Sequence, residues 1–360
     1  MREPCASEAD HAACAAAIRT GSHSFHAASR LMPARMRQPA YALYAFCRLA
    51  DDAVDLSAGK AAAVARLRRR LDAACAGRPQ DAAADRCFAD MMREHAMPRA
   101  LPEALIDGLA WDAEGRRCAD LSALRAYAAR VAGAVGAMMT VLMGVREPQI
   151  IARACDLGVA MQLTNVARDV GEDAREGRLY LPLDWMRATG VDPEAFLAAP
   201  RFTPEIAQMV AALLAEAERL YDRAAWGVRG LPRAARPGIR AARLIYREIG
   251  RDLARSGFDS VNRRAVVSAA TKRRLMALAV GGVGLPRIGR GAEPLAETRY
   301  LVEAVAACPP PENLVRPTVG DHIGRMAEIM MAAHQRETTR RLEAAEMARA
   351  VAGGLATAGE

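Results

Sequence analysis

The 360-residue chain has little of several things that would point to common folds and sites. Aromatic residues make up only 4% of it, so a hydrophobic core must be built from alanine, leucine, valine and methionine. Lysine occurs twice, at Lys60 and Lys272, among 50 basic residues. The eight cysteines include no C-x-x-C pair. This spacing disfavours a zinc or disulfide framework and predicts reduced thiols in a cytosolic protein.

Long apolar runs and sheet patterns are also missing. The longest nearly uncharged stretch, residues 131–145, is shorter than the roughly 20 residues that a membrane-spanning helix needs. The apolar run at residues 12–18 is short and follows acidic residues, which disfavours a secretory signal. No segment shows the alternation of a strand. We therefore expect a cytoplasmic protein, in contact with the inner membrane at most peripherally.

Alanine-rich segments dominate what is present and predict an all-α protein, because alanine is the best helix former. The pattern predicts one helical domain. Prolines, Pro39 among them, are expected to separate the helices. We place the main domain at residues 15–300 and a C-terminal helical extension of unknown role at 301–360. Helices are expected at about 38–56, 61–76, 82–95, 101–114, 121–143, 148–173, 204–226, 238–256 and 321–350, with loops at 281–294 and 308–320.

The formal charge of +8 suits anionic partners such as diphosphates or a lipid surface. It does not indicate nucleic acid, because neither a zinc finger nor a basic platform studded with aromatic residues accompanies it. Five arginines recur at helical spacing: Arg240, Arg243, Arg247, Arg251 and Arg255. A solvated helix face is the favoured interpretation, and docking on anionic lipid is the alternative.

Two acidic clusters interrupt otherwise apolar helical segments. In the first, Asp51 and Asp55 lie one helical turn apart, after Tyr44 and Arg48 on the same face. In the second, Asn165, Asp169 and Asp173 recur every four residues, preceded by Gln162, and Arg168 adjoins Asp169. A single pair of aspartates would most simply lie on a solvated helix face with local ion pairs. Because the same arrangement occurs twice, that explanation is weaker here.

The paired carboxylates predict a site for a divalent cation. Two carboxylates about 6 Å apart repel by roughly 3 kcal/mol at an effective dielectric near 20, and burial raises that cost. Mg²⁺ removes the conflict, because it takes oxygen ligands from one or two carboxylates together with substrate phosphate. Two pairs on facing helices would form two metal–diphosphate sites, with Arg48 and Arg168 as phosphate clamps.

Three segments carry a family resemblance: residues 24–31 (SFHAASRL), 41–55 (YALYAFCRLADDAVD) and 162–182 (QLTNVARDVGEDAREGRLYLP). They resemble the signatures of the squalene and phytoene synthase family, over roughly residues 20–275. Residues 131–139 (VAGAVGAMM), preceded by Tyr127, resemble the stretch that lines its prenyl pocket. In overall character the chain is most similar to the phytoene-forming members found in bacteria.

The resemblance implies a single-domain, isoprenoid-synthase-type helical bundle around a central cleft, and it assigns roles to matching positions. Mg²⁺ (with Mn²⁺ as an alternative) would be bound by Asp51, Asp55, Asn165, Asp169 and Asp173. The four aspartates together with Tyr44 and Tyr246 would be catalytic. Substrate would be bound by Phe25, Arg48, Arg168, Gln162, Asn165, Tyr127, Val131, Ala132, Gly136, Tyr180 and Arg264. The proton acceptor stays open between released diphosphate and a tyrosine, and His23 and His26 are disfavoured.

The implied reaction joins two geranylgeranyl diphosphates head to head, through a cyclopropylcarbinyl diphosphate (prephytoene diphosphate), to phytoene and two diphosphates. Its product would pass to downstream carotenoid enzymes. The small residues Ala27, Ala28, Ser29, Gly133 and Gly136 favour room for a C20 chain, and Ser29 is a candidate for the pocket floor.

Three other interpretations stay open. A relative that makes squalene or hydroxysqualene from C15 diphosphates would in its reductive form need NADPH; we expect none here, since no G-x-G-x-x-G follows a strand. A helical diphosphohydrolase would want the same carboxylates without a long apolar pocket. A non-catalytic helical partner would be expected to have lost some of the four aspartates, and all four are present.

Overall fold

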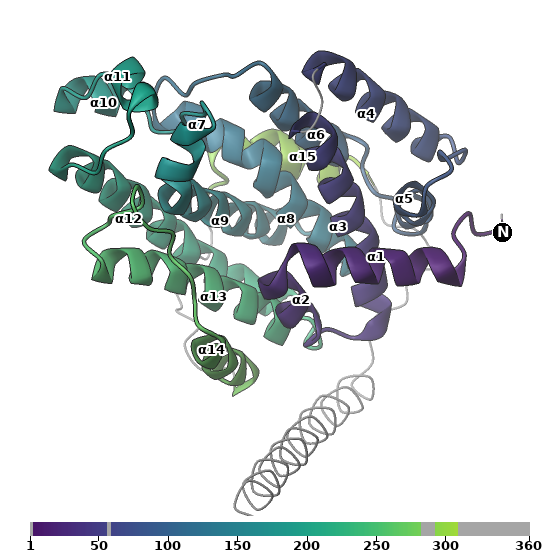
Figure 1. Cartoon of the computed structure of the whole chain (residues 1–360). Coiled ribbons are helices and arrows are strands. Elements are labelled where there is room, and N and C mark those ends of the chain that lie inside the picture. The colour runs from purple at the N-terminus through teal and green to yellow at the C-terminus, as the bar shows by residue number, and fades with distance from the viewer. Residues whose placement is uncertain (1–2, 56–58, 282–291, 309–360) are drawn as a thin grey trace, which may run out of the picture. The chain divides into compact units, whose positions relative to one another are not determined.

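The computed structural model describes residues 3–55, 59–281 and 292–308, with the backbone alone for 23–24 and 51–55. Over these residues the chain is helical and contains no strand, which confirms the all-α prediction (Figure 1). The helices are α1 (Glu8–Gly21), α2 (His23–Ser29), α3 (Ala34–Asp55), α4 (Lys60–Cys75), α5 (Ala83–Glu94), α6 (Ala100–Ala113), α7 (Leu121–Ala128), α8 (Ala134–Leu142), α9 (Pro148–Arg175), α10 (Leu183–Thr189), α11 (Pro193–Ala198), α12 (Pro204–Gly227), α13 (Arg236–Arg255), α14 (Ala269–Gly281) and α15 (Arg299–Ala306). A π-helical turn, Ala129–Gly133, joins α7 to α8.

Prolines mark the beginnings of helices more often than their ends. Pro148, Pro193 and Pro204 each occupy the first turn of a helix, where the missing N–H has no intrahelical partner to lose. The predicted break at Pro39 is wrong, because Pro39 lies inside α3, which begins at Ala34. The helix predicted at 321–350 and the loop at 308–320 fall outside the described residues, apart from residue 308.

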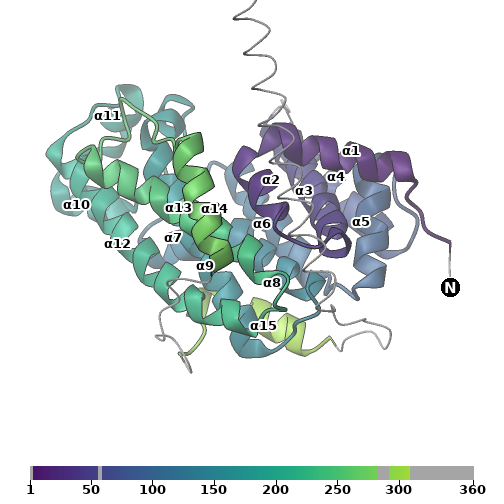
Figure 2. The ribbon, with the colours of Figure 1, turned by 90° about the horizontal axis from the view of Figure 1, so that it is seen from below.

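Helix α9 is the central element of the described bundle. It packs against α8 and the π-helical turn on one side and against α12 and α13 on the other. Figure 2 shows α1–α6 at one end of the bundle and α10–α13 at the other, with α8 and α9 between them. One hydrophobic core joins α1, α3–α6, α8 and α15, and a second joins α7 and α9–α13. The site is therefore positioned where the two cores meet along α9.

Two glycines allow α9 and α8 to approach closely. A Cβ atom on Gly158 would lie 2.2 Å from the carbonyl oxygen of Ala132, and one on Gly136 would lie 2.3 Å from that of Ala154. Neither position can carry a larger side chain without a backbone shift. Ala132 belongs to the π-helical turn, and such turns are frequent at functional sites.

The arginine stripe of α13 is only partly a solvated face. Arg243 is 2% exposed and donates from Nε to the carbonyl oxygen of Tyr221, at 2.8 Å. Arg247 is paired with Glu218 of α12. Arg251 and Arg255 are exposed and pair with Glu248 on their own helix. The solvated interpretation is thus wrong for the middle of the stripe, where arginines join α13 to α12.

Among the described residues, no helix combines the length and the apolarity that crossing a bilayer would require. Helix α15 packs against α8 and α9, with Leu301, Val302 and Val305 buried. The division of the chain at residue 300 stays a prediction, since residues 309–360 lie outside the described part.

Candidate functional site

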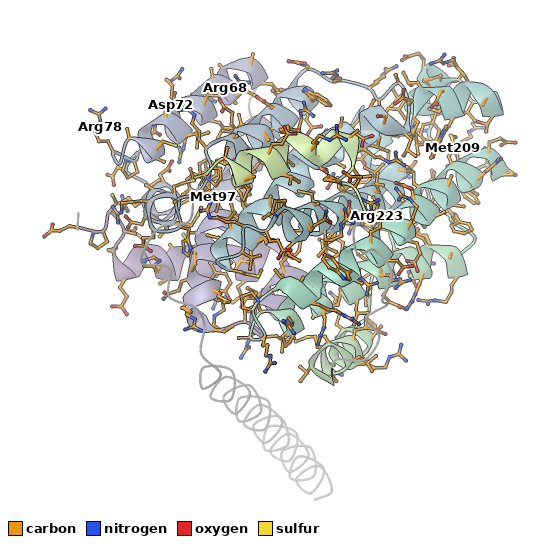
Figure 3. The ribbon with its side chains drawn as sticks, turned by 180° about the vertical axis from the view of Figure 1, so that it is seen from behind. Arg68, Asp72, Arg78, Met97, Met209 and Arg223 are labelled. Carbon is orange, nitrogen blue, oxygen red and sulfur yellow. The ribbon has the colours of Figure 1, made fainter. Side chains whose placement is uncertain are left out.

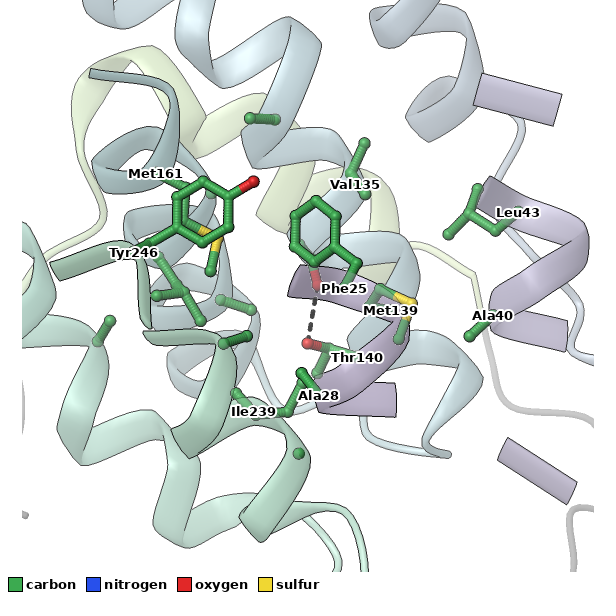
Figure 4. Close-up of a pocket in the computed structure, with 18 of the residues that line it drawn as sticks. Phe25, Ala28, Ala40, Leu43, Val135, Met139, Thr140, Met161, Ile239 and Tyr246 are labelled. Atoms are coloured by element: carbon green, nitrogen blue, oxygen red, sulfur yellow. Dashed lines mark hydrogen bonds between the residues drawn. The ribbon is translucent and has the colours of Figure 1, made fainter. Parts of the chain in front are cut away.

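A cavity of about 330 Å³ lies between α9 and the helices around it. Its wall is almost entirely apolar and includes Ala28, Leu43, Val135, Met139 and Met161 (Figure 4). Thr140 turns its hydroxyl back to the carbonyl oxygen of Gly136, at 2.9 Å, so this polar group is satisfied within its own helix. The cavity can hold a hydrocarbon chain and offers it few nucleophiles.

The cavity follows α9 over much of its length. The lining positions of this helix run from Ile150 through Leu157 and Met161 to Asn165. At about 1.5 Å per residue, the distance from Ile150 to Asn165 along the helix is about 22 Å. One end of the cavity is therefore apolar, and the other lies one helical turn before Asp169.

Two aromatic rings meet at the polar end of the cavity. Phe25 of α2 stacks on Tyr246 of α13, with 5.4 Å between the ring centroids (Figure 4). Burial raises the pKa of Tyr246 to about 12, partly offset by the positive charge of Arg168. Tyr246 is consequently neutral near pH 7 and can donate a hydrogen bond beside the arginine.

Asp169 is held between two arginines, and we call Arg168, Asp169 and Arg264 the Asp169 cluster. Nε of Arg168 and Nε of Arg264 each donate to Oδ1 of Asp169, at 2.8 Å in both cases. Although burial opposes ionisation, these hydrogen bonds lower the pKa of Asp169 below its ordinary value. Arg264 is 54% exposed and also lies 3.1 Å from Glu172. The cluster therefore combines a fixed negative charge with an accessible arginine.

Asp173 lies one turn beyond Asp169 on the same face of α9. Burial raises its pKa to about 7, with a further contribution from the charge of Asp169, although Nε of Arg178 lies 3.4 Å from it. The negative charge of Asp169 thus adds to burial in disfavouring the ionisation of Asp173. This is the electrostatic conflict that a divalent ion relieves.

An amide oxygen faces the same region. Oδ1 of Asn165 is buried and accepts no hydrogen bond from any described residue, while its Nδ2 lies 3.5 Å from Oε1 of Gln162. A buried oxygen without a donor is costly unless a ligand satisfies it. Asn165, Asp169 and Asp173 therefore fit the oxygen-donor set that Mg²⁺ prefers.

A second polar cluster contains two predicted site residues, Tyr127 and Tyr180, and one residue that was not predicted, Asp112. Tyr127 and Tyr180 stack at 5.1 Å, and both hydroxyls donate to Asp112 of α6, at 2.9 and 2.7 Å. Burial raises the pKa of both tyrosines. The sequence offered no signal for Asp112, because its partners lie on segments far along the chain.

The structure brings most of the predicted site residues to this one region. The cavity is lined by Phe25, Tyr44, Val131, Ala132, Gly136, Gln162, Asn165 and Tyr246. Arg168, Asp169, Asp173 and Arg264 lie beyond its polar end, and Tyr127 and Tyr180 contact Asp112. Arg48 is exposed and does not line the cavity. The side chains of Asp51 and Asp55, at the end of α3, lie outside the described residues, as do those of the disfavoured His23.

No group of three or more histidine, cysteine or carboxylate side chains gathers as a metal site within the part of the chain that is described. The second acidic cluster contributes the carboxylates of Asp169 and Asp173. A complete metal site would also require those of the first acidic cluster, Asp51 and Asp55. Metal binding, and the role of each site residue, therefore stay predictions.

Comparison with known proteins agrees with this architecture. The sequence profile of the family described as squalene/phytoene synthase matches residues 18–271. A phytoene synthase of Rhodobacter capsulatus is 55% identical over 307 residues, which cover 83% of this chain and 91% of the relative. A 15-cis-phytoene synthase of a Paracoccus species is 40% identical, covering 75% of this chain and 90% of the relative.

A solved structure shares the fold. The crystal structure of a dehydrosqualene synthase in complex with a ligand superposes with a TM-score of 0.71 at 29% identity. The match covers 77% of this chain and 97% of that one. The helical bundle, the apolar cavity and the profile match over residues 18–271 lead to one conclusion: the chain belongs to the squalene/phytoene synthase family.

Proposed function

We propose that this chain is a phytoene synthase, a prenyl transferase that condenses two geranylgeranyl diphosphates head to head. The observation that supports it most strongly is the apolar cavity, which runs about 22 Å along α9 and ends beside the Asp169 cluster. The relatives of Rhodobacter capsulatus and Cereibacter sphaeroides, 55% and 53% identical, carry the name phytoene synthase. A hydrocarbon tail would lie in the cavity, with its diphosphate at the polar end.

The length of the cavity suits a C20 chain. An extended chain advances about 1.2 Å per bond, from the roughly 3.5 Å that three backbone bonds span, so four isoprene units reach about 18 Å. That length fits between Asn165 and the apolar end. A diphosphohydrolase would have no use for such a cavity.

The residues at the polar end would bind and stabilise the leaving diphosphate. Arg264 is exposed enough to turn from Asp169 to a phosphate oxygen, and Arg168 lies beside it; arginine binds phosphate through two parallel hydrogen bonds. Asn165, Asp169 and Asp173, together with Asp51 and Asp55, would hold Mg²⁺. When bound, the ion would neutralise charge that develops on the diphosphate as the allylic C–O bond breaks.

The cavity itself would protect the allylic cation. Its apolar wall excludes water, which would otherwise capture the cation. Phe25 and Tyr246 stand at the reacting end, where the face of an aromatic ring stabilises positive charge. Because Tyr246 is neutral near pH 7 and the hydroxyls of Tyr127 and Tyr180 already donate to Asp112, released diphosphate is the better proton acceptor for the last step.

A product assay tests this proposal. Purified protein would be incubated with Mg²⁺ and either C15 or C20 prenyl diphosphate, with and without NADPH, and the hydrocarbons would be identified by mass. We expect a C40 polyene from the C20 substrate without NADPH. A C30 product, or a product that forms only with NADPH, would instead place the chain on the squalene-forming side of the family.

A further inference from the structure

Exposed large apolar side chains are few in the described part of the chain, and two of them belong to residues 263–281, which we call the α14 segment. Val266 is 71% exposed and Leu278 is 42% exposed, while the third, Tyr300, lies on α15. Single apolar side chains on a surface are ordinary. These two, however, share their segment with a concentration of positive charge.

The α14 segment carries positive charge without negative charge. Residues 260–281 contain Arg263, Arg264, Lys272, Arg273 and Arg274 and no acidic residue. Arg263 and Arg264 pair with carboxylates of α13 and α9. No carboxylate among the described residues pairs with Lys272, Arg273 or Arg274, and both of these arginines are exposed. Positive charge that the protein does not compensate attracts an anionic partner.

One side of α14 fixes the helix to the bundle and the other faces outward. Leu275 and Ala279 are buried, and Arg240 of α13 donates from Nη1 to the carbonyl oxygen of Ala279, at 3.5 Å. Arg274 and Leu278 lie one helical turn apart and are both exposed. The outward side of α14 therefore presents a basic and an apolar side chain together.

The α14 segment begins at the polar end of the cavity. Ala265 and Val267 are buried in the second hydrophobic core, so the side chain of Val266 between them points outward. Val266 follows Arg264 of the Asp169 cluster by two residues, and their Cα atoms therefore lie within about 7 Å of each other. A partner that covers Val266 would lie beside the Asp169 cluster.

The arginines of α13 do not offer a comparable surface. Arg251 and Arg255 pair with Glu248, and Arg247 pairs with Glu218, so the protein itself compensates their charge. Docking on anionic lipid, the alternative interpretation of that stripe, fits α14 better. Uncompensated basic side chains next to exposed apolar ones are what an interfacial helix presents to a lipid surface.

We propose that the α14 segment docks this protein on the surface of a bilayer that contains anionic lipid. Lys272, Arg273 and Arg274 attract the headgroups, and Val266 and Leu278 enter the boundary between headgroups and acyl chains. The docking is independent of the reaction. Its consequence, that prenyl diphosphates and the hydrocarbon product exchange with the bilayer beside the Asp169 cluster, rests on the proposed function.

Co-sedimentation of the full chain with vesicles tests the docking. Vesicles of phosphatidylcholine alone are compared with vesicles that contain an equal amount of phosphatidylglycerol, at low and at high salt. We expect wild-type protein to bind the mixed vesicles alone, and to bind them less at high salt.

Two variants separate the contributions of charge and of apolar contact. Lys272→Gln/Arg273→Gln/Arg274→Gln should bind mixed vesicles about 100-fold more weakly, because each basic side chain near an anionic surface contributes about fivefold. Val266→Thr/Leu278→Gln should bind about tenfold more weakly at either salt concentration, because it loses apolar area that docking buries.

The matched control removes the same charge from another helix. Arg66, Arg68 and Arg69 are exposed on α4, which lies on the opposite side of the bundle from α14 (Figures 1 and 3; Arg68 is labelled in Figure 3). Arg66→Gln/Arg68→Gln/Arg69→Gln has the same net charge as the α14 charge variant and should bind mixed vesicles like wild-type protein. Circular dichroism verifies that each variant is folded.

Three results would overturn the docking. Equal losses in the α14 and α4 charge variants would mean that net charge alone explains the binding. Binding to phosphatidylcholine alone that ignores salt would remove the role of the basic side chains. A change of oligomeric state in the α14 variants, seen by analytical ultracentrifugation with unchanged vesicle binding, would make the segment a contact between two copies of the chain.

Turnover separates the docking from the proposed function. With C20 diphosphate supplied in mixed vesicles, the α14 charge variant should be about tenfold slower than wild-type protein, because docking concentrates the enzyme at the surface that holds its substrate. With detergent-dispersed substrate the two should be equal. Vesicle binding without any hydrocarbon product would contradict the proposed function and leave the docking in place, whereas equal turnover from vesicles would overturn the exchange with the bilayer.

Discussion

Two clusters of the same composition, each with one aspartate of α9 between two arginines, differ in their surroundings. One is the Asp169 cluster, and the other, called the Asp156 cluster, consists of Arg153, Asp156 and Arg223 of α12. In the Asp156 cluster, Arg153 and Asp156 are 0% exposed, whereas Arg264 of the Asp169 cluster is 54% exposed. Burial raises the pKa of Asp156, while burial at Asp169 is outweighed by its two arginines, which lower the pKa. Only at Asp169 does a second carboxyl group, Asp173, follow one turn later among the described residues of α9.

The solvent exposure of the arginines explains why the two clusters suit different roles. An exposed arginine exchanges a carboxylate for a phosphate at little cost, because surface ion pairs contribute about 0–1 kcal/mol. A buried arginine cannot exchange its carboxylate for a phosphate in this way, because loss of one partner leaves an unpaired charge in the protein interior. The Asp169 cluster is therefore suited to ligand binding, and the Asp156 cluster to joining α9 to α12.

The largest expected effect is on activity at the Asp169 cluster. Asp169→Asn should lower kcat/KM about 1000-fold, equivalent to about 4 kcal/mol of transition-state stabilisation, because the substituted site holds metal and diphosphate poorly. Its free energy of unfolding should change by no more than about 1 kcal/mol. Steady-state kinetics and urea unfolding measure the two quantities. Full activity in this variant would remove the Asp169 cluster from the site.

The matched substitution at the Asp156 cluster should affect stability instead. Asp156→Asn leaves two arginines without their carboxylate, so the free energy of unfolding should fall by about 3 kcal/mol. Activity per folded molecule with the C20 substrate should stay within about threefold, because the diphosphate end is untouched. If Asp156→Asn is folded by circular dichroism but has lost most of its kcat, the Asp156 cluster is not purely structural.

Smaller effects are expected when arginine is replaced by lysine, which keeps the charge but loses the planar fork. Arg168→Lys should raise KM for the prenyl diphosphate about tenfold, or about 1.4 kcal/mol, with little change in stability. Arg223→Lys should lower the free energy of unfolding by about 1 kcal/mol and leave KM unchanged. Arg168→Lys should therefore change KM alone, and Arg223→Lys should change the melting temperature alone. If both variants change both quantities, the two clusters do not have the separate roles described here.

The sequence predicted the elements that carry strong local patterns. The helices of the middle of the chain were recognised from proline positions and apolar spacing, and α9 was placed within two residues of its observed end. The alignment of Gln162, Asn165, Asp169 and Asp173 on one face follows from helical periodicity alone. Helix α1 was missed because its buried positions, Cys14 and Ile18 among them, stand in a run of alanines with little contrast between faces.

What the sequence could not predict depends on contacts between distant segments. Asp112 of α6 meets Tyr127 of α7 and Tyr180, in the segment between α9 and α10, only after these parts of the chain pack together. Arg153 is one of many arginines, and nothing local distinguishes it from a solvated one; its burial follows from α12 and from the carbonyl oxygen of Glu293. Such sites have no spacing signature, because the residues that define them are neighbours in space alone.

The most direct test of the account is calorimetric binding of inorganic diphosphate in the presence and absence of Mg²⁺. We predict that wild-type protein binds diphosphate only when Mg²⁺ is present and that Asp156→Asn, measured as folded protein, binds it equally well. Asp169→Asn should bind at least about 100-fold more weakly, corresponding to about 2.7 kcal/mol. Binding that needs no metal, or that survives in Asp169→Asn and disappears in folded Asp156→Asn, would contradict the assignment of the diphosphate site to the Asp169 cluster.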